Sequence, residues 1–442
     1  MSKYARVTTI GLWHLGSVTS ACFAAYGHSV VGIDPDEAVA RNLSKGITPI
    51  YEPGLGEMIK GQLNRSLSFT TDFKKGLRDS EYVAITFDTP VNDDDTPNLD
   101  PILKSIEKAI PFLKDGVLLV VSSQVPIGTC ERIRDMIKKR RPSLDFGIAC
   151  IPENLKLGEA IERFMSPDLL VIGAENERDF EKARGLYGFV KGPILHANLR
   201  TAEMVKHAIN AFLACQISLS NELGNFCDNS GVDWLKVSAA LHLDKRIGPN
   251  AMLHAGLGFG GGTLARDVGV LRRTGRQNGT ETAMLDAIIT VNDRQNAVII
   301  GKLRSTFGKL KGLRVGVLGL TYKPGTSTIR RSASIAIIKE LAEHGVKVSA
   351  YDPKAEFKKS EVSVSFERCK TPESVADGSN ALLLLTGWPE FKDLDFKRIK
   401  AKMKNPVIVD ALNMLDPEKL SRYGFSYIGI GRGLKSGTFQ YK

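Results

Sequence analysis

The feature that most constrains the fold of this chain is an alternation of short apolar runs with helical segments. In residues 1–198 the apolar runs are unbroken and rich in Val, Ile and Leu, and they read RVTTIGL, SVVGID, YVAITFD, VLLVVSS, FGIACIPE and LLVIGA. Apolar strands without polar alternation, separated by helices, are typical of a parallel sheet that helices cover on both faces. We therefore predict that residues 1–198 form a doubly wound, Rossmann-like α/β domain.

The pattern changes to helices over residues 199–304 and then returns. The helical part is led by TAEMVKHAINAFLACQISLSNELGNFCDNSG, a run that ends at Gly231. We interpret so long a helix as a spine between domains or as a dimer surface. Over residues 305–442, the runs RVGVLGL, KVSAYDP, ALLLLTGW and PVIVDAL predict a second, smaller Rossmann-like α/β domain. The sequence thus predicts two α/β domains joined by a helical centre with a long spine helix.

Composition narrows the class of protein. No stretch approaches the ~20 apolar residues of a membrane span, and no signal peptide precedes Tyr4, so we expect a cytoplasmic protein without a membrane partner. The net charge of +11 is spread along the chain, and its densest run, Lys138 to Arg141, is interpreted as a solvated helix end. We expect no nucleic-acid partner, and a basic surface suits an anionic small substrate equally well.

The cysteines show no metal or redox pattern. None of the six forms a C-x-x-C pair, so we interpret them as reduced, mostly core thiols and expect no metal site. They are Cys22, Cys130, Cys150, Cys215, Cys227 and Cys369.

The turn after the first apolar run carries part of a dinucleotide-binding fingerprint. In GLWHLG, Gly11 and Gly16 hold the first and third glycine places, while Trp13 stands in the second, where the pyrophosphate normally approaches the backbone. Asp34 follows the next strand, at the spacing where a carboxylate accepts the ribose 2′-hydroxyl and repels a 2′-phosphate, which favours NAD over NADP. The alternative is a βαβ unit that binds nothing here. Trp13 supports that alternative, since NAD would need the indole ring turned aside.

Two polar features stand in the helical centre. Lys206 and Asn210 are four residues apart and share one helix face, where a cation beside an amide can stabilise an alkoxide. The alternative is a solvated surface lysine with a polar neighbour. The loop GLGFGGG, Gly256 to Gly262, indicates either close approach to a ligand or only a flexible loop, because so many glycines cost conformational entropy.

Six sequence blocks carry a family resemblance. They are GITPIYEPGL (Gly46 to Leu55), DTPVNDDD (Asp88 to Asp95), SSQVPIGT (Ser122 to Thr129), AEMVKHAIN (Ala202 to Asn210), DKRIGPNAMLHAGLGFGGGTLARD (Asp244 to Asp267) and GLTYKPGTSTIRRS (Gly319 to Ser332). In this order they resemble the UDP-glucose/GDP-mannose dehydrogenase family of nucleotide-sugar dehydrogenases, over nearly the whole chain. The resemblance implies an NAD-binding domain at 1–198, a dimer-forming helical centre at 199–304, and a UDP-sugar-binding domain at 305–442. Typical members oxidise the sugar C6 alcohol to a carboxylate in two hydride transfers, through a cysteine thiohemiacetal and thioester.

The resemblance also implies roles for individual residues. Catalytic roles fall to Lys206, Asn210, Asp267, Thr263 and Glu153, with Asp267 orienting water or the lysine. The cofactor-binding residues are Gly11, Trp13, Gly16, Asp34, Thr89, Gln124, Arg266 and Arg330. The substrate-binding residues are Glu153, Lys206, Asn210, Arg246, Phe259, Gly260 and Lys323, with Arg246 reaching substrate across a dimer. Taken alone, Arg246, Lys323 and Arg330 would each be interpreted as surface charges.

The sequence departs from the family at the catalytic loop. Thr263 stands where the nucleophilic cysteine belongs, and a threonine hydroxyl is a poor nucleophile without a strong adjacent base. Gln124 replaces a threonine that touches cofactor and water, and Leu157 replaces a glutamate. In the C-terminal part, Ser327 and Thr328 replace two aspartates, and Leu412 replaces an arginine. Since Lys206, Asn210, Glu222, Asp267, Lys323 and the glycine loop remain, we interpret the pattern as altered chemistry on an intact fold.

Three functions are consistent with these residues. In the first, the protein is an NAD-dependent nucleotide-sugar dehydrogenase: water or Lys206 takes the hydroxyl proton, Asn210 holds the oxygen, and oxidation stops after one hydride transfer or continues through a hydrated aldehyde. In the second, bound NAD is used transiently, as in epimerisation or elimination. The third is a non-enzymatic nucleotide-sugar binder, which Trp13 and Thr263 support. A homodimer is expected through the central helix.

Overall fold

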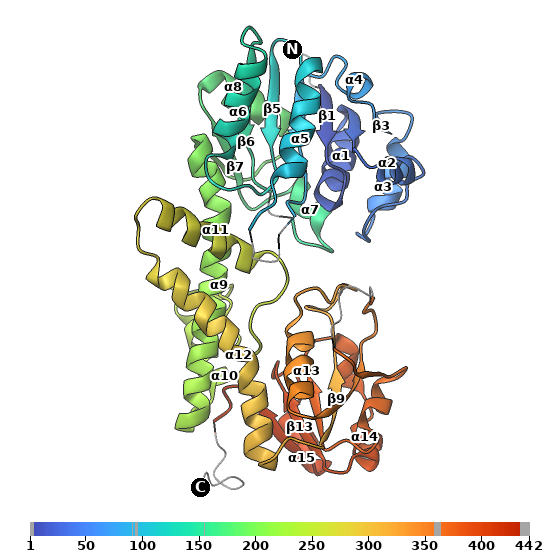
Figure 1. Ribbon diagram of the computed structural model, residues 1–442, viewed down its shortest axis with the longest axis vertical. Coiled ribbons are helices and arrows are strands. Elements are labelled where there is room, and N and C mark those ends of the chain that lie inside the picture. Colours follow the sequence, from blue (N-terminus) through green and yellow to red (C-terminus); the bar gives the residue numbers. More distant parts are fainter. Residues whose placement is uncertain (1–3, 91, 93–95, 154, 358–363, 434–442) are drawn as a thin grey trace. The chain divides into compact units, whose positions relative to one another are not determined.

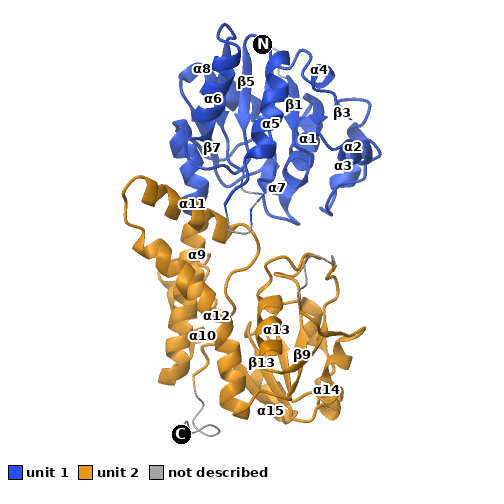
Figure 2. Cartoon of the chain, in the orientation of Figure 1, with its two compact units in different colours: residues 1–209 blue, residues 210–442 orange. Residues whose placement is uncertain are grey.

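The chain forms two compact units, residues 1–209 and 210–442 (Figure 2). The computed structural model describes residues 4–90, 92, 96–153, 155–357 and 364–433. Residues 91 and 93–95 of the block Asp88 to Asp95 lie outside this description. Each unit is built on one sheet with helices packed against it (Figure 1).

The sheet of the first unit has eight strands in the order β3-β2-β1-β4-β5-β6-β7-β8. The strands are β1 (Arg6–Ile10), β2 (Ser29–Ile33), β3 (Leu67–Thr70), β4 (Tyr82–Ile85), β5 (Val117–Val121), β6 (Phe146–Cys150), β7 (Leu170–Ala174) and β8 (Ile194–Ala197). All neighbours are parallel except β6 and β7, which pair antiparallel. All six predicted apolar runs form strands, and β3 and β8 extend the sheet at its two edges. The strand order reverses between β1 and β4, which is where open α/β sheets bind ligands.

The helices of this unit are α1 (His14–Tyr26), α2 (Glu37–Leu43), α3 (Leu55–Gln62), α4 (Phe73–Gly76), α5 (Asp100–Ala109), α6 (Thr129–Arg140), α7 (Ala160–Met165) and α8 (Glu177–Leu186), with a short 3-10 helix at Ile110–Phe112.

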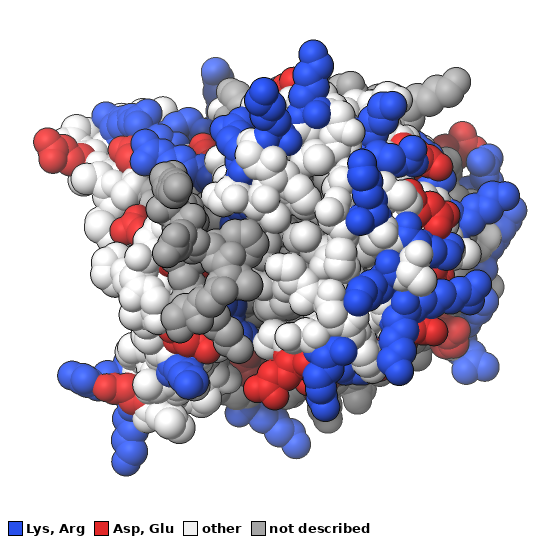
Figure 3. All heavy atoms as spheres, turned by 90° about the horizontal axis from the view of Figure 1, so that it is seen from below, with Lys and Arg blue, Asp and Glu red and all other residues white. Residues whose placement is uncertain are grey.

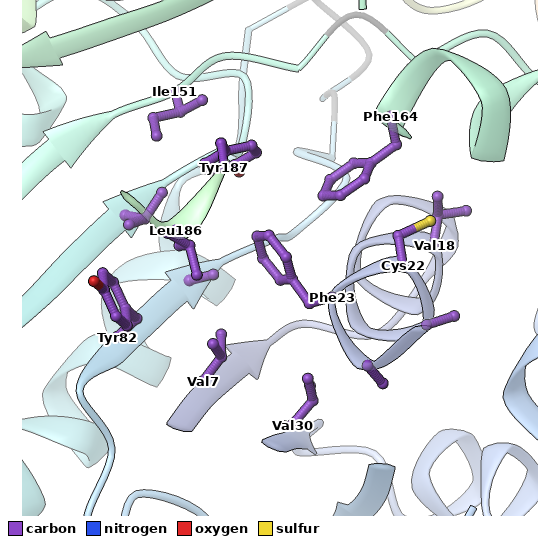
Figure 4. Close-up of a cluster of buried hydrophobic side chains, with 14 of the residues drawn as sticks. Val7, Val18, Cys22, Phe23, Val30, Tyr82, Ile151, Phe164, Leu186 and Tyr187 are labelled. Atoms are coloured by element: carbon purple, nitrogen blue, oxygen red, sulfur yellow. The ribbon is translucent and has the colours of Figure 1, made fainter. Parts of the chain in front are cut away.

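A buried aromatic cluster holds helix α1, and with it the turn between β1 and α1, in place. Phe23 of α1 packs edge-on against Phe164 and Tyr187, with ring centroids 5.3 Å apart in both pairs (Figure 4). Beneath it lie Val7 of β1 and Val30 of β2, both buried. Edge-to-face packing of this kind holds α1 against the strands whose ends carry the turn.

The long helix predicted at the centre is present as α9 (Leu199–Ser230), with 32 residues. It ends as predicted before Gly231, whose φ of +69° a glycine adopts without strain. Residues up to 209 belong to the first unit, and residues from 210 belong to the second. The second unit continues with α10 (Trp234–Leu243), α11 (Leu264–Gln277) and α12 (Ala283–Phe307).

The second unit holds a six-stranded sheet in the order β11-β10-β9-β12-β13-β14, and all its pairs are parallel. The strands are β9 (Arg314–Leu318), β10 (Lys347–Tyr351), β11 (Glu367–Arg368), β12 (Ala381–Leu384), β13 (Val407–Asp410) and β14 (Ser426–Gly429). The helices packed on it are α13 (Ala333–Glu343), α14 (Phe396–Lys402) and α15 (Pro417–Arg422), with 3-10 helices at Pro372–Ala376 and Pro389–Asp393. The predicted architecture of two α/β sheets and a helical segment is confirmed, while the domain limits at 198 and 304 stay predictions.

Three further features of the described residues concern surface charge, membrane-spanning helices and metal-binding groups. On the face shown in Figure 3, Lys and Arg side chains surround the rim and are most numerous on its right-hand side, with Asp and Glu among them. Within the described part of the chain, no helix has the length and apolar composition needed to cross a bilayer. The same residues contain no group of three or more His, Cys, Asp or Glu side chains placed to hold a metal ion.

Candidate active site

The turn between β1 and α1 requires glycine at the two places that hold it. Gly11 has a φ of +93°, and a Cβ there would lie 2.7 Å from the Phe87 ring. A Cβ on Gly16 would lie 1.7 Å from the backbone oxygen of Gly11. The first glycine therefore makes the turn, and the third brings α1 against the strand end, as a dinucleotide-binding turn requires.

Trp13 occupies the N-cap position of α1 and forms no side-chain capping hydrogen bond. The residue is 50% exposed, so its indole is not a core group. Two carboxylates accept backbone N–H groups around it instead. Leu12 N–H donates to Asp34 Oδ2 at 2.7 Å, and Leu15 N–H donates to Asp88 Oδ2 at 3.0 Å.

Asp34 lies directly after β2, where the fingerprint places the ribose-binding carboxylate. Its second oxygen accepts the N–H of Asp36 at 2.9 Å, and burial raises the pKa of this carboxyl above its usual value. A carboxylate offers about four lone-pair sites, so two backbone donors leave acceptor capacity for a ribose hydroxyl. The glycine cradle and Asp34 therefore fit NAD.

Glu153 and Lys206 form the centre of a charged cluster in the first unit. Burial raises the pKa of the Glu153 carboxyl, and the nearby Lys206 cation only partly opposes this shift. Asp88 and His14 also lie near enough to act on Glu153. The Leu155 N–H donates to the Glu153 carboxylate. A carboxyl held toward its protonated form beside a cation can accept or release a proton during a reaction.

Thr89 and Gln124 meet at the ends of β4 and β5. The Thr89 hydroxyl donates to the Gln124 carbonyl at 2.6 Å. The Gln124 amide donates to His207 Nδ1 at 3.0 Å, and His207 Nε2 donates to the Val125 carbonyl at 2.9 Å. His207 lies on α9 and is buried, so its hydrogen bond holds the side-chain amide of Gln124 against this helix.

In the second unit, Asp267 is fully buried and is held by two predicted site residues. Arg266 Nε donates to Asp267 Oδ1 at 2.9 Å, and the Asn210 amide donates to Asp267 Oδ2. The Asp267 carboxylate thereby fixes the orientation of the Asn210 amide. This arrangement leaves the Asn210 carbonyl oxygen pointing away from Asp267, because the amide nitrogen makes the bond.

Thr263 stands at the N-cap position of α11 and is exposed. Its backbone carbonyl accepts the Asp267 N–H at 3.1 Å, which closes the first turn of the helix. No described residue forms a hydrogen bond with the Thr263 hydroxyl. A threonine hydroxyl without an adjacent base is not activated for covalent chemistry.

The glycine loop borders a cavity of about 220 Å³ within the second unit. Phe259 and Gly260 line it on the loop side, and Tyr322, Ser334 and Leu412 line it on the side of the second sheet. Leu385, which follows β12, and Thr321, which comes after β9, also line it, so the cavity lies at the reversal of strand order. Leu412, which stands where the resemblance places an arginine, gives this cavity an apolar wall.

Close backbone packing explains two glycines of that loop. A Cβ at Gly256 would lie 2.7 Å from the Ala411 carbonyl oxygen, and a Cβ at Gly260 would lie 2.7 Å from the Arg331 carbonyl oxygen. The loop therefore holds glycine at these two positions because it packs against backbone, and flexibility is not needed to explain them.

Two of the three remaining predicted charges are exposed, and the third lies beside Tyr322. The Arg246 guanidinium pairs with Asp244 at 2.7 Å, and its side chain is 88% exposed. Lys323 Nζ lies 5.7 Å from the ring centroid of Tyr322, which lines the cavity. Arg330 is exposed. The roles assigned to these residues stay predictions.

Comparison with known proteins gives the same organisation along the chain. The sequence matches three domains of one family: an NAD binding domain over residues 5–191, a central domain over residues 200–294, and a UDP binding domain over residues 316–417. The UDP-glucose 6-dehydrogenase of Pseudomonas aeruginosa is 35% identical, with 97% of each chain covered. The chain belongs to the UDP-glucose/GDP-mannose dehydrogenase family.

Other proteins of this family are similar to this chain over nearly its whole length. The UDP-glucose 6-dehydrogenase TuaD of Bacillus subtilis is 34% identical over 98% of this chain and 94% of its own. A UDP-glucose dehydrogenase structure from Pyrobaculum islandicum matches with a TM-score of 0.88 at 32% identity, covering 98% of both chains. A UDP-D-ManNAc dehydrogenase structure from Pyrococcus horikoshii matches with a TM-score of 0.86 at 27% identity, covering 97% of this chain and 99% of that one.

The predicted family, the fold class and NAD as the cofactor are confirmed, and the protein is an NAD-dependent oxidoreductase of this family. When NAD is bound, the residues that would hold it are those of the Gly11 to Gly16 turn together with Asp34.

Several polar residues around these sites were not singled out by the sequence. In the first unit, His14 Nε2 donates to Glu52 at 2.9 Å, and Glu52 also accepts the N–H groups of Gly158 and Ala160, which hold the start of α7. In the second unit, three amides hold the glycine loop through contacts with Gly256, Leu257 and Phe259, and they are Asn221, Asn292 and Gln295. In the sequence, each of these residues is an amide side chain within an amphipathic helix. That pattern does not indicate which residue the amide contacts.

Proposed function

We propose that this chain is an NAD-dependent dehydrogenase that oxidises a carbinol of a UDP-sugar without a covalent enzyme intermediate. The observation that carries the proposal is in the α11 segment. Asp267 and Asn210 form a buried hydrogen-bonded pair, whereas the Thr263 hydroxyl, in the position of the family's thiol, has no hydrogen-bond partner among the described residues. Groups suited to hold oxygen and move protons are retained, and the nucleophile is missing.

The reaction removes a hydride from the carbinol carbon and a proton from its oxygen, and leaves a carbonyl. NAD, when bound, accepts the hydride. An ordered water takes the proton, or the Lys206 amine does so once its ammonium has given a proton to solvent, and Glu153, whose pKa burial raises, can accept the proton next when it is in its carboxylate form. The second N–H of the Asn210 amide, whose first N–H donates to Asp267, donates to the reacting oxygen as negative charge develops on it.

Without a thiol, a second oxidation needs a hydrated aldehyde as its substrate. Water adds to the aldehyde carbonyl, and the resulting diol loses a second hydride and a proton to give the carboxylate. This route needs no bond between sugar and protein, so it is open to a chain with Thr263. Oxidation that stops at the carbonyl is the other form of the same proposal.

The test is a stoichiometry measurement with purified protein, NAD and a panel of UDP-sugars. NADH is counted per sugar consumed, and the product is identified by mass spectrometry. One NADH with a carbonyl product, or two with a carboxylate, supports the proposal. A changed sugar without net NADH would indicate transient use of bound NAD instead, and no change with any sugar would indicate a binder. The Lys206→Met variant is expected to lose turnover while it keeps NAD binding.

We propose further that a second copy of this chain covers the exposed side of α9. Phe212, Leu219 and Phe226 are 66%, 51% and 65% exposed, and their spacing of seven residues places them along one side of the helix. Phe226→Glu is expected to convert a dimer to a monomer in light scattering. Leu195→Glu, at a residue 43% exposed on β8, is the matched control and should leave the mass unchanged.

A further inference from the structure

The first turn of α1 already holds an anion from its own chain. Its N-cap residue, Trp13, provides no side-chain acceptor. The carboxylate of Asp88, from the segment that follows β4, accepts the Leu15 N–H at 3.0 Å in its place. Because β4 is the sheet neighbour of β1, this segment lies at the strand ends beside the turn.

A dinucleotide uses the same donors. Its pyrophosphate sits at the N-terminus of the helix that follows the glycine turn, and it accepts first-turn backbone N–H groups while the helix dipole favours its charge. The donor bound to Asp88 is one of these groups. An N–H that points at one carboxylate oxygen cannot make an equally good bond to a phosphate oxygen at the same time.

The surroundings add to the negative charge. Glu153 lies close enough to Asp88 for the Asp88 charge to raise the pKa of Glu153. His14, the first residue of α1, already donates a hydrogen bond to Glu52 at 2.9 Å. Lys206 lowers the pKa of Glu153 in this cluster, and His14 does so to a smaller degree. A pyrophosphate at this turn thus meets the carboxylate of Asp88, and the imidazole of His14 at the same helix end already faces Glu52.

We propose that Asp88 sets the cofactor affinity of this protein: its carboxylate occupies the pyrophosphate position at the N-terminus of α1, and NAD binds by displacing it. The inference rests on the placement of NAD at the Gly11 to Gly16 turn. Charge repulsion and competition for one donor both act on the pyrophosphate, and neither acts on the adenosine part of the cofactor.

Weak cofactor binding also distinguishes two functions that are both consistent with the sequence, a dehydrogenase and an enzyme that uses bound NAD transiently. A dehydrogenase must release its reduced cofactor in every cycle, whereas an enzyme that uses NAD transiently must keep it bound. An internal competitor at the pyrophosphate position speeds release, because the site regains its own anion when the cofactor leaves. Asp88 therefore favours the dehydrogenase reaction over transient use of bound NAD.

The test is calorimetric titration of the full chain with NAD, ADP-ribose and adenosine. Asp88→Asn keeps an oxygen that can accept the Leu15 N–H but removes the charge. It should tighten NAD and ADP-ribose binding by about fivefold or more, the factor for removing a like charge about 4 Å away in water. Adenosine affinity should stay within about twofold of wild type, because this probe lacks the pyrophosphate. Asp100→Asn, at a side chain 73% exposed on α5, is the matched control and should change none of the three.

Three outcomes would overturn the proposal: unchanged or weaker NAD binding in Asp88→Asn, an equal gain for adenosine, or no NAD binding by either protein. If the asparagine variant does not fold, Asp88→Ser carries the same expectation and the same tests. The gain should also shrink as salt rises from ~20 to ~300 mM, because salt screens charge repulsion. Turnover of UDP-sugars is measured separately, so a protein that binds NAD as expected but oxidises no sugar would contradict the proposed function and leave the role of Asp88 standing.

Discussion

Replacing Gly16 with alanine tests the geometry on which the cofactor turn depends. The new Cβ would lie 1.7 Å from the Gly11 carbonyl oxygen, whereas real Cβ atoms essentially never come within 3.0 Å of a heavy atom outside their own and the adjoining residues. It would also lie 2.8 Å from the Thr86 hydroxyl oxygen. The first obstacle is backbone, so it cannot rotate away. Helix α1 must move by more than 1 Å at its first turn, relative to the end of β1, to relieve the contact.

The structure allows an estimate of the cost. Forcing a methyl group into a packed site costs typically ~1–3 kcal/mol, and a backbone obstacle places this case at the upper end, about 3 kcal/mol. Alanine is a better helix former than glycine by ~1 kcal/mol, which offsets part of it. A net loss of about 2 kcal/mol lowers the melting temperature of a unit of this size by roughly 4–8 °C. NAD binding should fall by at least about tenfold, because a 1 Å displacement misaligns the first-turn donors.

The assay combines thermal melting, followed at each transition, with calorimetric titration by NAD. Gly61→Ala is the matched control: Gly61 lies in α3, and an added Cβ there has no atom within 4 Å. This variant should be neutral or more stable by up to ~1 kcal/mol, and it should bind NAD as wild type does. If Gly16→Ala melted with wild type and bound NAD equally well, close packing of α1 on the turn would not be what selects glycine there.

Three further predictions test the rest of the site. Burial raises the pKa of Glu153, so the folded chain binds the carboxyl proton more tightly than the unfolded chain does. The protonated carboxyl therefore stabilises the fold at a pH below the ordinary carboxyl pKa. This contribution to the free energy of unfolding is lost as the pH rises through the raised pKa. Glu153→Gln should therefore raise the melting temperature near neutral pH and leave it unchanged in acid, and an equal gain at both pH values would contradict the raised pKa of Glu153. Thr263→Cys should permit covalent trapping of an aldehyde, seen as a mass adduct; active protein without an adduct would count against the alignment of Thr263 with the family thiol. Asp352→Asn should destabilise the second unit by about 2 kcal/mol. One carboxylate oxygen accepts the N–H groups of Leu320 and Thr321 and the Trp388 indole, the other accepts the N–H groups of Lys354 and Ala355, and an amide has only one oxygen that can accept. A second-unit melting transition unchanged from wild type would refute that account.

The sequence predicted those strands that are buried on both faces and therefore appear as unbroken apolar runs. The six unbroken apolar runs became β1, β2, β4, β5, β6 and β7, since burial on both faces removes polar alternation. The edge strands were missed for the same reason. Leu67–Thr70 and Ile194–Ala197 are partly exposed and too short to show a pattern. The antiparallel pairing of β6 with β7 was also missed, because hydropathy carries no information on strand direction.

The sequence predicted those parts of the candidate site whose residues lie at a characteristic spacing along the chain. Gly11, Gly16 and Asp34 belong to one βαβ unit, so their relation can be read locally. The contacts of Asp88 with Leu15 and of Glu52 with His14 join segments that only the folded sheet brings together. Each also depends on rotamer and register, which periodicity does not determine.

The two sheets share one strand-end geometry although they match different domains of the family, the NAD binding domain and the UDP binding domain. Gly11 and Gly319 come after the first strand of each sheet with φ values of +93° and +95°, and the next residue in each case is a leucine whose N–H donates to the aspartate after the next strand, Asp34 or Asp352.

The two units differ in the segment between this glycine and the next helix. In the first unit α1 begins at His14, so its first-turn donors face the strand ends directly. In the second unit α13 begins only at Ala333, and the long intervening segment lines the cavity through Thr321 and Tyr322. Asp352 is further occupied by Thr321 and by the Trp388 indole at 3.0 Å, so it has less capacity for a ribose than Asp34 has. The second sheet therefore lacks the compact turn that a dinucleotide needs, and a loop-walled cavity of about 220 Å³ lies at its strand ends instead.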